Sequence, residues 1–462
     1  MSTGAESGGQ SDLPDGLEAP RRHWAAATLM LALTIAVLDA SMVNVALPAI
    51  ARELGIAPGQ IVWIVIAYSL VVVVSLLPLS AVAERIGFRR MFAIGLTLFM
   101  VSSIGSASAG GLLSLTISRM MQGLGGAMLM CLFGGLVRNI YPNRKLGVGL
   151  SLNAMTVGIM AVLGPTAGAF LLQMTSWHWI FLLTIPLCLL AYAGIRFLPD
   201  VPRSKSRFDW TACALSVPVF GLSIFGLDAL VRAPTLAALC LLSAGLVGWV
   251  LVRRSLGQAA PLVPVDLLRI TPIAYAVGAS VFSFAAQMAA FVAVPFYFQH
   301  TLGYSYADVG VLLGAWSIGV AVMAPVAGYL SGRYAVAVLC GIGAGVMALG
   351  LLGVLLLSIQ ASFLWFILVM LAGGTGFGFF QTPNNRAMLA GAPRYRSGAA
   401  GGMQATTRVF GQTLGTTLVG LSFNLAGPNG ARLGLGAAMA CALIALIINI
   451  VRHRNPVADL EL

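Results

Sequence analysis

The sequence of 462 residues is 59% hydrophobic and only 9% charged. Soluble domains carry about a quarter charged residues, so this composition excludes a water-soluble globule and indicates a chain that faces lipid. The net charge of +12 might suggest a nucleic-acid partner. The basic residues, however, lie between apolar runs, so they report membrane topology and attraction to anionic lipid. No nucleic acid is expected as a partner.

In chain order, the polar segment 1–23 is expected to be a disordered cytoplasmic tail. A bilayer core of ~30 Å takes about 20 helical residues, which is the length of the apolar runs that follow. The short alternating segments of a membrane β-barrel are absent from the sequence. The chain is therefore predicted to be an all-α membrane protein with about fourteen transmembrane helices, at 24–48, 60–82, 91–110, 112–137, 146–172, 178–198, 210–230, 235–254, 272–298, 306–331, 335–357, 361–388, 398–425 and 432–451.

The positions of the basic residues predict the orientation of these helices. An even number of spans places both termini on one side, and all but five of the 26 Lys and Arg residues fall on that side. By the positive-inside rule both termini are cytoplasmic, in a multi-pass protein of the cell (inner) membrane that is expected to be a monomer. The five exceptions are Arg52, Arg119, Arg232, Arg408 and Arg432.

The loops predict an internal division of the chain. Two longer segments that contain proline, 199–209 and 255–271, bracket one pair of spans. The predicted organisation is a six-helix bundle at 24–198, an inserted helix pair with its linkers at 199–271, a second six-helix bundle at 272–451, and a cytoplasmic tail at 452–462. The loop Ala83–Arg90 has a counterpart at Gly328–Arg333. Two related bundles that meet at a site near the membrane midplane are typical of secondary transporters.

Several spans carry recognisable motifs. The first ends in the sequence LDASMVNVALP at 38–48, the fourth carries RMMQGLGG at 119–126, and the fifth carries Gly158 with GPTAG at 164–168. Trp177–Phe181 and the segment Arg408–Gly411 with Gly415 add two more. In these motifs the chain resembles the fourteen-helix drug:proton antiporter branch of the major facilitator superfamily, over essentially everything after residue 23.

The resemblance implies which residues gate the transporter. The loop after the second span would latch the two bundles, although Ser80, Val82, Glu84 and Phe88 stand where the family usually has Gly, Leu, Asp and Arg. Pro165 bends its span, and glycines four apart let helices approach closely, which helix packing alone would also explain. The candidate gating and conformational residues are Glu84, Arg85, Gly87, Arg89, Arg90, Gly158, Gly164, Pro165, Gly168, Arg333 and Arg408.

Asp39 and Arg119 are the candidate proton-coupling residues. An ionisable group inside a span costs ~2.5–3.5 kcal/mol on insertion scales and is by default a functional hypothesis. Asp39 precedes Pro48 by nine residues and Arg119 lies seven residues into its span, so both lie at a similar depth. Desolvation favours a protonated carboxyl and a nearby cation favours an ionised one, which suits a proton carrier. The alternative is a static pair that orients two helices.

The candidate substrate-binding residues combine Asp39 with aromatic, Met and amide side chains, because sites for amphipathic ligands pair apolar walls with few polar anchors. Each of these side chains could equally face lipid or a neighbouring helix. They are Met42, Tyr68, Gln287, Phe291 and Trp316, with Phe284 and Phe377 as further candidates.

Other classes of function lack support in the sequence. A phosphate-cradling G-x-x-x-x-G-K-[ST] loop is absent, the four histidines lie at span ends, and no metal-ligand or cofactor motif is present, so neither an enzyme nor a cofactor is expected. The expected function is proton-coupled multidrug efflux, with small molecules and protons competing for one cavity. Asp39 as the only deep acid predicts a preference for monovalent cationic compounds. The alternatives are a proton-coupled exporter of one metabolite, such as a siderophore, an amino acid or an envelope precursor, and a non-transporting scaffold or sensor.

Overall fold

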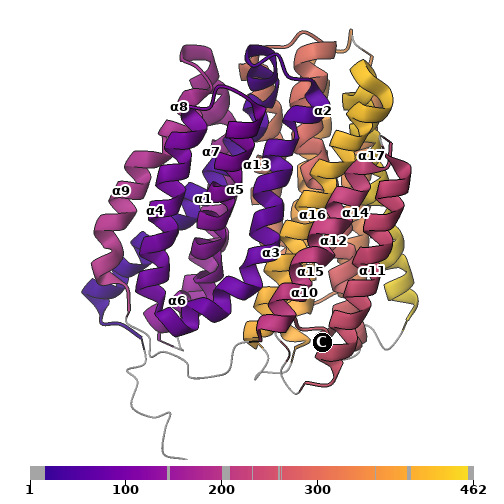
Figure 1. Ribbon diagram of the computed structural model, residues 1–462. Coiled ribbons are helices and arrows are strands. Elements are labelled where there is room, and N and C mark those ends of the chain that lie inside the picture. Colours follow the sequence, from indigo (N-terminus) through magenta and orange to yellow (C-terminus); the bar gives the residue numbers. More distant parts are fainter. Residues whose placement is uncertain are drawn as a thin grey trace, which may run out of the picture.

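The computed structural model describes residues 16–454 except 143–145, 200–208, 232, 259–260, 262, 359 and 393–396, together with Asn455. Figure 1 shows an assembly of long helices that run roughly side by side. The described residues contain helices and no strand. The predicted all-α membrane fold is confirmed.

The described helices follow one another as fourteen long segments, three of which are broken by a non-regular turn. Pro58–Ile61 continues into Trp63–Ile86, Leu112–Cys131 into Phe133–Ile140, and His178–Leu182 into Thr184–Gly194. Twelve described stretches are long and apolar enough to cross a membrane, and the last of them, Ala400–Arg454, holds two helices. The helices are α1 Ala19–Glu53, α2 Pro58–Ile61, α3 Trp63–Ile86, α4 Phe88–Ala107, α5 Leu112–Cys131, α6 Phe133–Ile140, α7 Leu146–Met174, α8 His178–Leu182, α9 Thr184–Gly194, α10 Trp210–Ala229, α11 Pro234–Leu256, α12 Thr271–Phe296, α13 Tyr306–Leu330, α14 Val336–Leu356, α15 Phe363–Ala390, α16 Ser397–Ala426 and α17 Gly430–Arg454.

Two helices extend beyond the predicted spans. Helix α1 begins at Ala19, inside the segment expected to be a disordered tail, of which 1–15 lie outside the described residues. A proline at its first turn starts the helix, and the Arg21 guanidinium donates hydrogen bonds to the carbonyl oxygens of Phe197 and Leu198 at 3.1 Å each. Helix α17 likewise continues to Arg454. Hydropathy marks the part of a helix that lies in lipid, and these helices extend past it.

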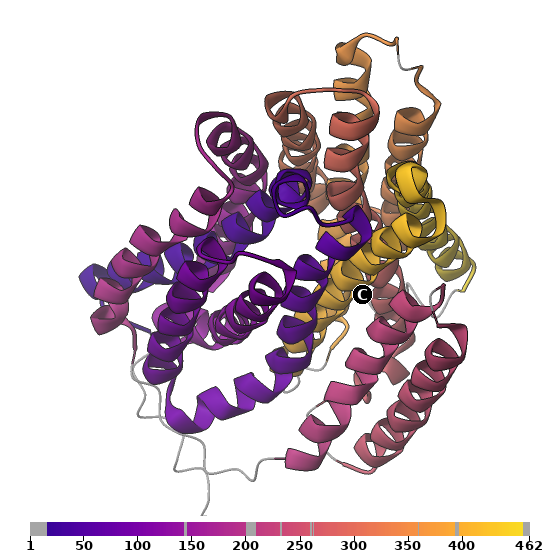
Figure 2. The same ribbon diagram turned by 45° about the horizontal axis from the view of Figure 1, so that its top comes forward.

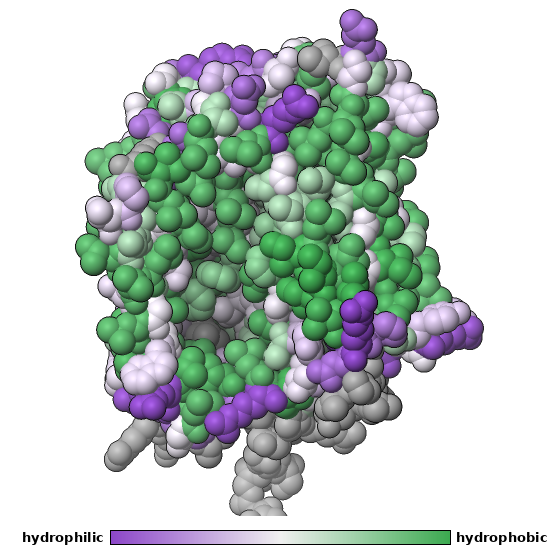
Figure 3. Space-filling model, turned by 90° about the vertical axis from the view of Figure 1, so that its right-hand side faces the viewer, coloured by the Kyte–Doolittle hydropathy of each residue, from purple (hydrophilic) through white to green (hydrophobic). Residues whose placement is uncertain are grey.

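Both described ends of the chain lie at the same end of the molecule, the lower end in Figure 1. The helix ends that carry Arg85, Arg196, Arg253 and Arg454 lie there too, because the spans alternate in direction from the start of α1. We call this the basic end. Figure 3 shows the consequence on one face, where a wide apolar belt separates polar rims and is hollowed in its lower half.

Helices α1–α9 form the N-terminal half and α12–α17 the C-terminal half, which lie beside each other in Figure 2. One buried apolar cluster unites both halves and includes Met42, Phe284 and Trp316. Two further clusters are divided between the halves, one built almost entirely from α1–α9 with Val409 added, the other from Leu267, α12 and α14–α17. Contacts between the halves toward the end opposite the basic end include the approach of Gly59 to Phe423. The halves are thus packed together most continuously there.

Helices α10 and α11 pack on each other, and α10 also packs on α3 and α16. The Phe220 and Phe410 rings lie 5.5 Å apart across the contact between α10 and α16. At the basic end, Asp209 caps α10 and accepts hydrogen bonds from Arg254 and Gln258, both at 2.9 Å. Although partial burial raises the pKa of Asp209, these contacts and the Ala212 amide lower it below its ordinary value. The predicted division into two bundles and an inserted pair is consistent with this packing and stays a prediction.

We expect one close helix contact to be intolerant of even a methyl group. A Cβ atom at Gly374 in α15 would overlap the backbone carbonyl of Trp316 in α13, so Gly374→Ala should force the two helices apart. Overpacking of this kind costs ~1–3 kcal/mol or more. The variant should therefore give a lower melting temperature and less monodisperse protein in detergent.

The matched control is Gly345→Ala in α14, where the nearest atom to the added Cβ is Leu446 Cδ2 at 3.9 Å. Alanine stabilises an unhindered helical position by up to ~1 kcal/mol, so this variant should melt at or above the temperature of the parent. Equal melting of both variants would contradict the predicted clash.

Candidate functional site

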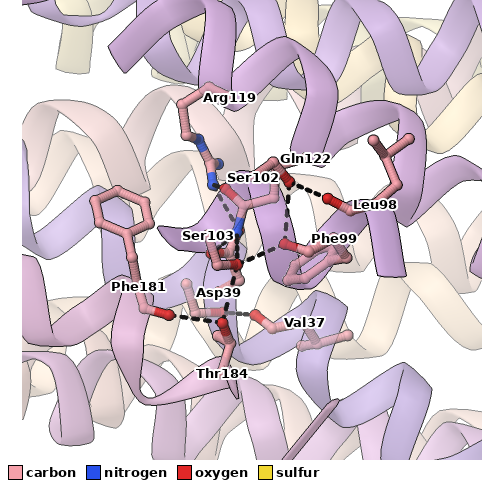
Figure 4. A network of polar contacts seen from close by, with 11 residues as sticks. Val37, Asp39, Leu98, Phe99, Ser102, Ser103, Arg119, Gln122, Phe181 and Thr184 are labelled. Atoms are coloured by element: carbon pink, nitrogen blue, oxygen red, sulfur yellow. Dashed lines mark hydrogen bonds and ion pairs between the residues drawn. The ribbon is translucent and has the colours of Figure 1, made fainter. Parts of the chain in front are cut away.

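Asp39 and Arg119 form a fully buried ion pair, as the sequence predicted (Figure 4). The distance from Arg119 Nη1 to Asp39 Oδ2 is 2.7 Å, and the two side chains are 1% and 0% exposed. The same Nη1 donates to Gln122 Oε1 at 2.7 Å, while Gln122 Nε2 donates to Asp39 Oδ1 at 2.9 Å. Both carboxylate oxygens of Asp39 are therefore engaged by the protein. Its role in proton coupling stays a prediction.

The network continues from the ion pair to two further helices. Gln122 Nε2 also donates to Ser103 Oγ of α4 at 2.9 Å, and Thr184 of α9 donates to the same oxygen at 3.1 Å. Thr184 lies directly after the break between α8 and α9, and its single hydroxyl proton is shared between Ser103 Oγ and the Phe181 carbonyl oxygen, which is 2.7 Å away. A chain of hydrogen bonds thus joins α1, α4, α5 and α9 in the interior of the N-terminal half.

Tyr68 covers the cationic side of the network. Its ring centroid lies 4.3 Å from Arg119 Cζ, within the range of a cation–π contact. Arg119 Nε is buried and has no hydrogen-bond partner among the described residues. Tyr68, predicted as a substrate contact, therefore lies against the ion pair; its contact with substrate stays a prediction.

The glycines of the fifth-span motif bring α7 onto α1 beside Asp39. A Cβ at Gly164 would lie 2.5 Å from Ser41 Cβ, and one at Gly168 would lie 3.1 Å from Met42 Cα. Because neither position has room for a side chain, the glycines are needed for this approach. Pro165 and Gly158 lie in the same helix. Met42 is fully buried in this contact, so the packing explanation holds for the glycine pair, and the mechanical role stays a prediction.

The remaining substrate candidates lie in the C-terminal half. The Phe291 and Trp316 rings meet edge to face at 5.9 Å, and Phe284 meets Phe377 in the same way at 5.3 Å. Gln287, half-buried on α12, lies one helical turn from both Phe284 and Phe291. The structure therefore separates the candidates into a polar group around Asp39 and an aromatic group on α12, α13 and α15.

Arg89, one of the loop residues predicted to latch the halves, has its hydrogen bonds within the N-terminal half. Arg89 Nε donates to the Leu198 carbonyl at 2.7 Å and Arg89 Nη2 to the Arg196 carbonyl at 2.9 Å, which fixes the start of α4 to the end of α9. Gly87 adopts φ 94° between α3 and α4, a conformation that favours glycine. Arg85 is half-buried and Arg90 exposed, while the side chain of Glu84 lies outside the described part. In the C-terminal half, Arg333 covers the ring of Tyr329 at 4.6 Å.

A second acid is buried as well. Asp228, near the outer end of its span, is only 7% exposed. It lies in the last turn of α10 and accepts a hydrogen bond from Trp63 Nε1 of α3 at 3.2 Å. Asp39 is therefore not the only buried acid. No group of His, Cys, Asp and Glu suited to a metal ion occurs among the described residues.

Sequence reasoning missed three members of the Asp39 network. Gln122 stands three residues after Arg119, which places both on one helix face and could have identified it. Ser103 and Thr184 gave no such signal, because hydroxyl residues are common in the spans.

Comparison with known proteins decides the family. The model of the Major Facilitator Superfamily matches residues 29–416, which is most of the chain. The chain belongs to the Major Facilitator Superfamily. It is therefore a transporter, and the Asp39 network lies within the matched region. The finer assignment to a fourteen-helix drug:proton branch stays a prediction.

Curated relatives differ in their named function. The chain is 41% identical to the protein named "Uncharacterized transporter YebQ" of Escherichia coli, over 96% of this chain and 98% of that protein. It is 27% identical to the riboflavin transporter RibZ of Clostridioides difficile, over 84% and 85% of the two chains. It is 29% identical to the multidrug efflux pump LfrA of Mycolicibacterium smegmatis, over 89% and 82%.

Solved structures support the fold alone. A POT family transporter in complex with a thioalcohol-conjugated peptide superposes with a TM-score of 0.70 at 15% identity, covering 93% of this chain and 96% of that one. The transporter fold described above is thus shared with proteins of very different sequence.

We expect Gln122 to be required for the stability of the network. Gln122→Leu removes the donor to Asp39 and Ser103 and the acceptor of Arg119, which leaves buried polar groups unsatisfied at ~1–3 kcal/mol. The variant should melt at a clearly lower temperature in detergent.

Thr97→Val is the control, because Thr97 in α4 is exposed and bonds only the backbone of its own helix, at Ala93. It removes one hydroxyl from a span without touching the network, and its melting temperature should stay within about 1 °C of the parent. An equal loss in both variants would mean that the network contributes no more than any other polar contact.

Proposed function

We propose that this transporter is a proton-coupled antiporter that exports amphipathic small molecules by alternating access. The observation that carries the proposal is the ion pair of Asp39 and Arg119, buried in the membrane interior with both carboxylate oxygens engaged. A proton that reaches Asp39 removes the charge that holds Arg119 and Gln122, so protonation changes the stability of contacts among four helices. The similarity of this chain to the multidrug efflux pump LfrA supports export.

Helix α1 connects the proton site to the contacts between the halves. Within one and a half turns it carries Asp39, then Ser41 and Met42 against α7, then Asn44, whose Nδ2 lies 3.9 Å from Met288 Sδ of α12. Helix α7 in turn meets α13, where a Cβ at Gly310 would lie 2.7 Å from Ala169 Cβ. A shift of α1 on protonation would therefore act on both contacts.

The positive-inside rule supports a cytoplasmic basic end, in the cell (inner) membrane, with both termini inside. Protons would then enter from the opposite end, where the halves are most closely packed. We further propose that the protein acts as a monomer, because the buried apolar cluster that unites the two halves is built from one chain.

A carrier of a single metabolite is the second candidate, and similarity to the riboflavin transporter RibZ favours it. Growth inhibition in an efflux-deficient host distinguishes the two. We expect expression to raise tolerance to several chemically unrelated toxicants. Tolerance to one compound alone would favour the single-metabolite carrier, and tolerance to none would contradict multidrug export.

Neutralising Asp39 should abolish proton coupling. The side chain that Asp39→Asn introduces cannot release a proton. Its amide nitrogen would face the Nε2 donor of Gln122, unless the Gln122 amide rotates and loses its hydrogen bonds with Arg119 and Ser103. Export driven by an imposed pH gradient in proteoliposomes should fall by at least about tenfold, while passive exchange of substrate continues.

Asp228→Asn serves as the control, because it neutralises a buried carboxylate of a different helix pair that lies outside the network. It should keep most of the gradient-driven export. Full gradient-driven export by Asp39→Asn would overturn the proposed coupling site, and equal loss in both variants would mean that the effect is not specific to Asp39.

A further inference from the structure

Arg408, like Arg119, lies well inside a span that the sequence predicts, and unlike Arg119 it has no acidic partner in the described part of the chain. It is half-buried on α16, and its Nε atom is buried without a hydrogen-bond partner. The described ion pairs are those of Arg119 with Asp39 and Arg254 with Asp209. Arg408 therefore stands as an uncompensated cation.

The contacts of α16 fix the direction of this side chain. Gly411 and Gly415 face α12, where added Cβ atoms would lie 2.5 Å from Val281 O and 2.2 Å from Ala285 O. Val409 belongs to the buried cluster of the N-terminal half, and Phe410 meets Phe220 of α10. At about 100° per residue, Arg408 projects between the α12 side and the N-terminal half, and away from α10.

The depth of Arg408 makes its charge energetically unfavourable. It follows Ser397, the first residue of α16, by eleven residues, which at 1.5 Å per residue places it ~16 Å into the helix from the basic end. An arginine at such a depth is rare and pairs with an anion or marks a substrate pathway. About one turn away along α16, a Cβ at Gly411 would lie 3.0 Å from Phe284 Cβ, and the buried ring of Phe284 meets that of Phe377 at 5.3 Å, so an aromatic pair packs one helical turn from Arg408.

The two acids that are buried among the described residues have partners other than Arg408. Both oxygens of Asp39 are engaged by Arg119 and Gln122, and Asp39 is fully buried. Asp228 bonds Trp63 in the last turn of α10, toward the opposite end. No described carboxylate forms an ion pair with Arg408, so a cargo at this position would meet a cation, and an anionic cargo would find a guanidinium with a fork of donors.

We propose that Arg408 selects amphipathic organic anions with an aromatic ring system, and that its guanidinium binds their carboxylate or other acidic group. This inference rests on the proposed export function and replaces the sequence-based expectation of monovalent cations. With one proton per cycle, export of a monovalent anion moves two positive charges inward, so an inside-negative membrane potential drives it; export of a monovalent cation would move none.

The test uses two dyes that share one xanthene skeleton and differ in charge, the anionic methyl ester of fluorescein and the cationic methyl ester of rhodamine. Binding to the purified protein in detergent is followed by fluorescence anisotropy. We expect the anion to bind at least about tenfold more tightly, because a charge-assisted hydrogen bond is worth about that factor. Equal or tighter binding of the cation, or binding of neither dye, would overturn the inference.

Variants then assign the preference to Arg408. Arg408→Gln should remove the preference for the anion, by about tenfold in its affinity, and Arg408→Lys should restore most of it. Arg432→Gln, which removes an exposed arginine at the start of the next helix, α17, should leave both affinities unchanged. An unchanged ratio in Arg408→Gln would reject the role of Arg408. The dye comparison on the parent protein stands even if that variant fails to fold.

Transport separates this inference from the proposed function. In proteoliposomes we expect export of the anionic dye to respond to both a pH gradient and an imposed inside-negative potential. Export of the cationic dye that depends on the pH gradient and on Asp39 would leave the antiporter proposal intact and overturn the anion preference. Tight, Arg408-dependent binding of the anion without any response to the pH gradient would instead overturn proton coupling.

Discussion

The buried ion pair of Asp39 and Arg119 is the constraint on which the arrangement of the N-terminal half depends. Taking two charges out of water is repaid only if the geometry is good and further hydrogen bonds satisfy the remaining atoms. Gln122 supplies those bonds by accepting from Arg119 and donating to Asp39 and Ser103. The partners come from three different helices, so the relative positions of α1, α4 and α5 are fixed together. A change in the charge of one residue of this network therefore alters the hydrogen bonds that hold all three helices.

Helix α1 carries this constraint to the rest of the molecule. It contacts α7 through positions where only glycine fits, and it reaches α12 through Asn44. Contacts between the halves include ones toward the end opposite the basic end, and the other two apolar clusters lie almost entirely within one half each, with Val409 of α16 joining the N-terminal cluster. Cores that belong mostly to one half suit a rocking motion of the two halves, because each half keeps its own packing while the contact between them opens.

The sequence was sufficient for the fold, because hydropathy over some 20 residues marks a span directly. It also identified Asp39 and Arg119, since a charge in an apolar run stands out. It could not identify Ser103 or Thr184, because hydroxyls in helices commonly bond their own backbone, as Thr97 does with Ala93, and only the fold distinguishes these cases. The true start of α1 depends on Arg21 and the carbonyl groups of Phe197 and Leu198, a contact across 176 residues or more that no local pattern contains. The burial of Asp228 could not be predicted for the same reason, since it depends on Trp63 of another helix.

The separation of charges also bears on how a proton and a cargo are exchanged. Direct competition, as expected from the sequence, requires both to use the same carboxylate, yet Asp39 is completely buried and engaged by Arg119 and Gln122. Arg408 lies on α16 in the other half of the molecule and makes no ion pair with a described residue. If the proton acts at Asp39 and the cargo at Arg408, neither displaces the other from a shared atom. Coupling must then pass through the relative position of the two halves, which α1 and α16 both help to form, so that the two sites bias one conformational equilibrium.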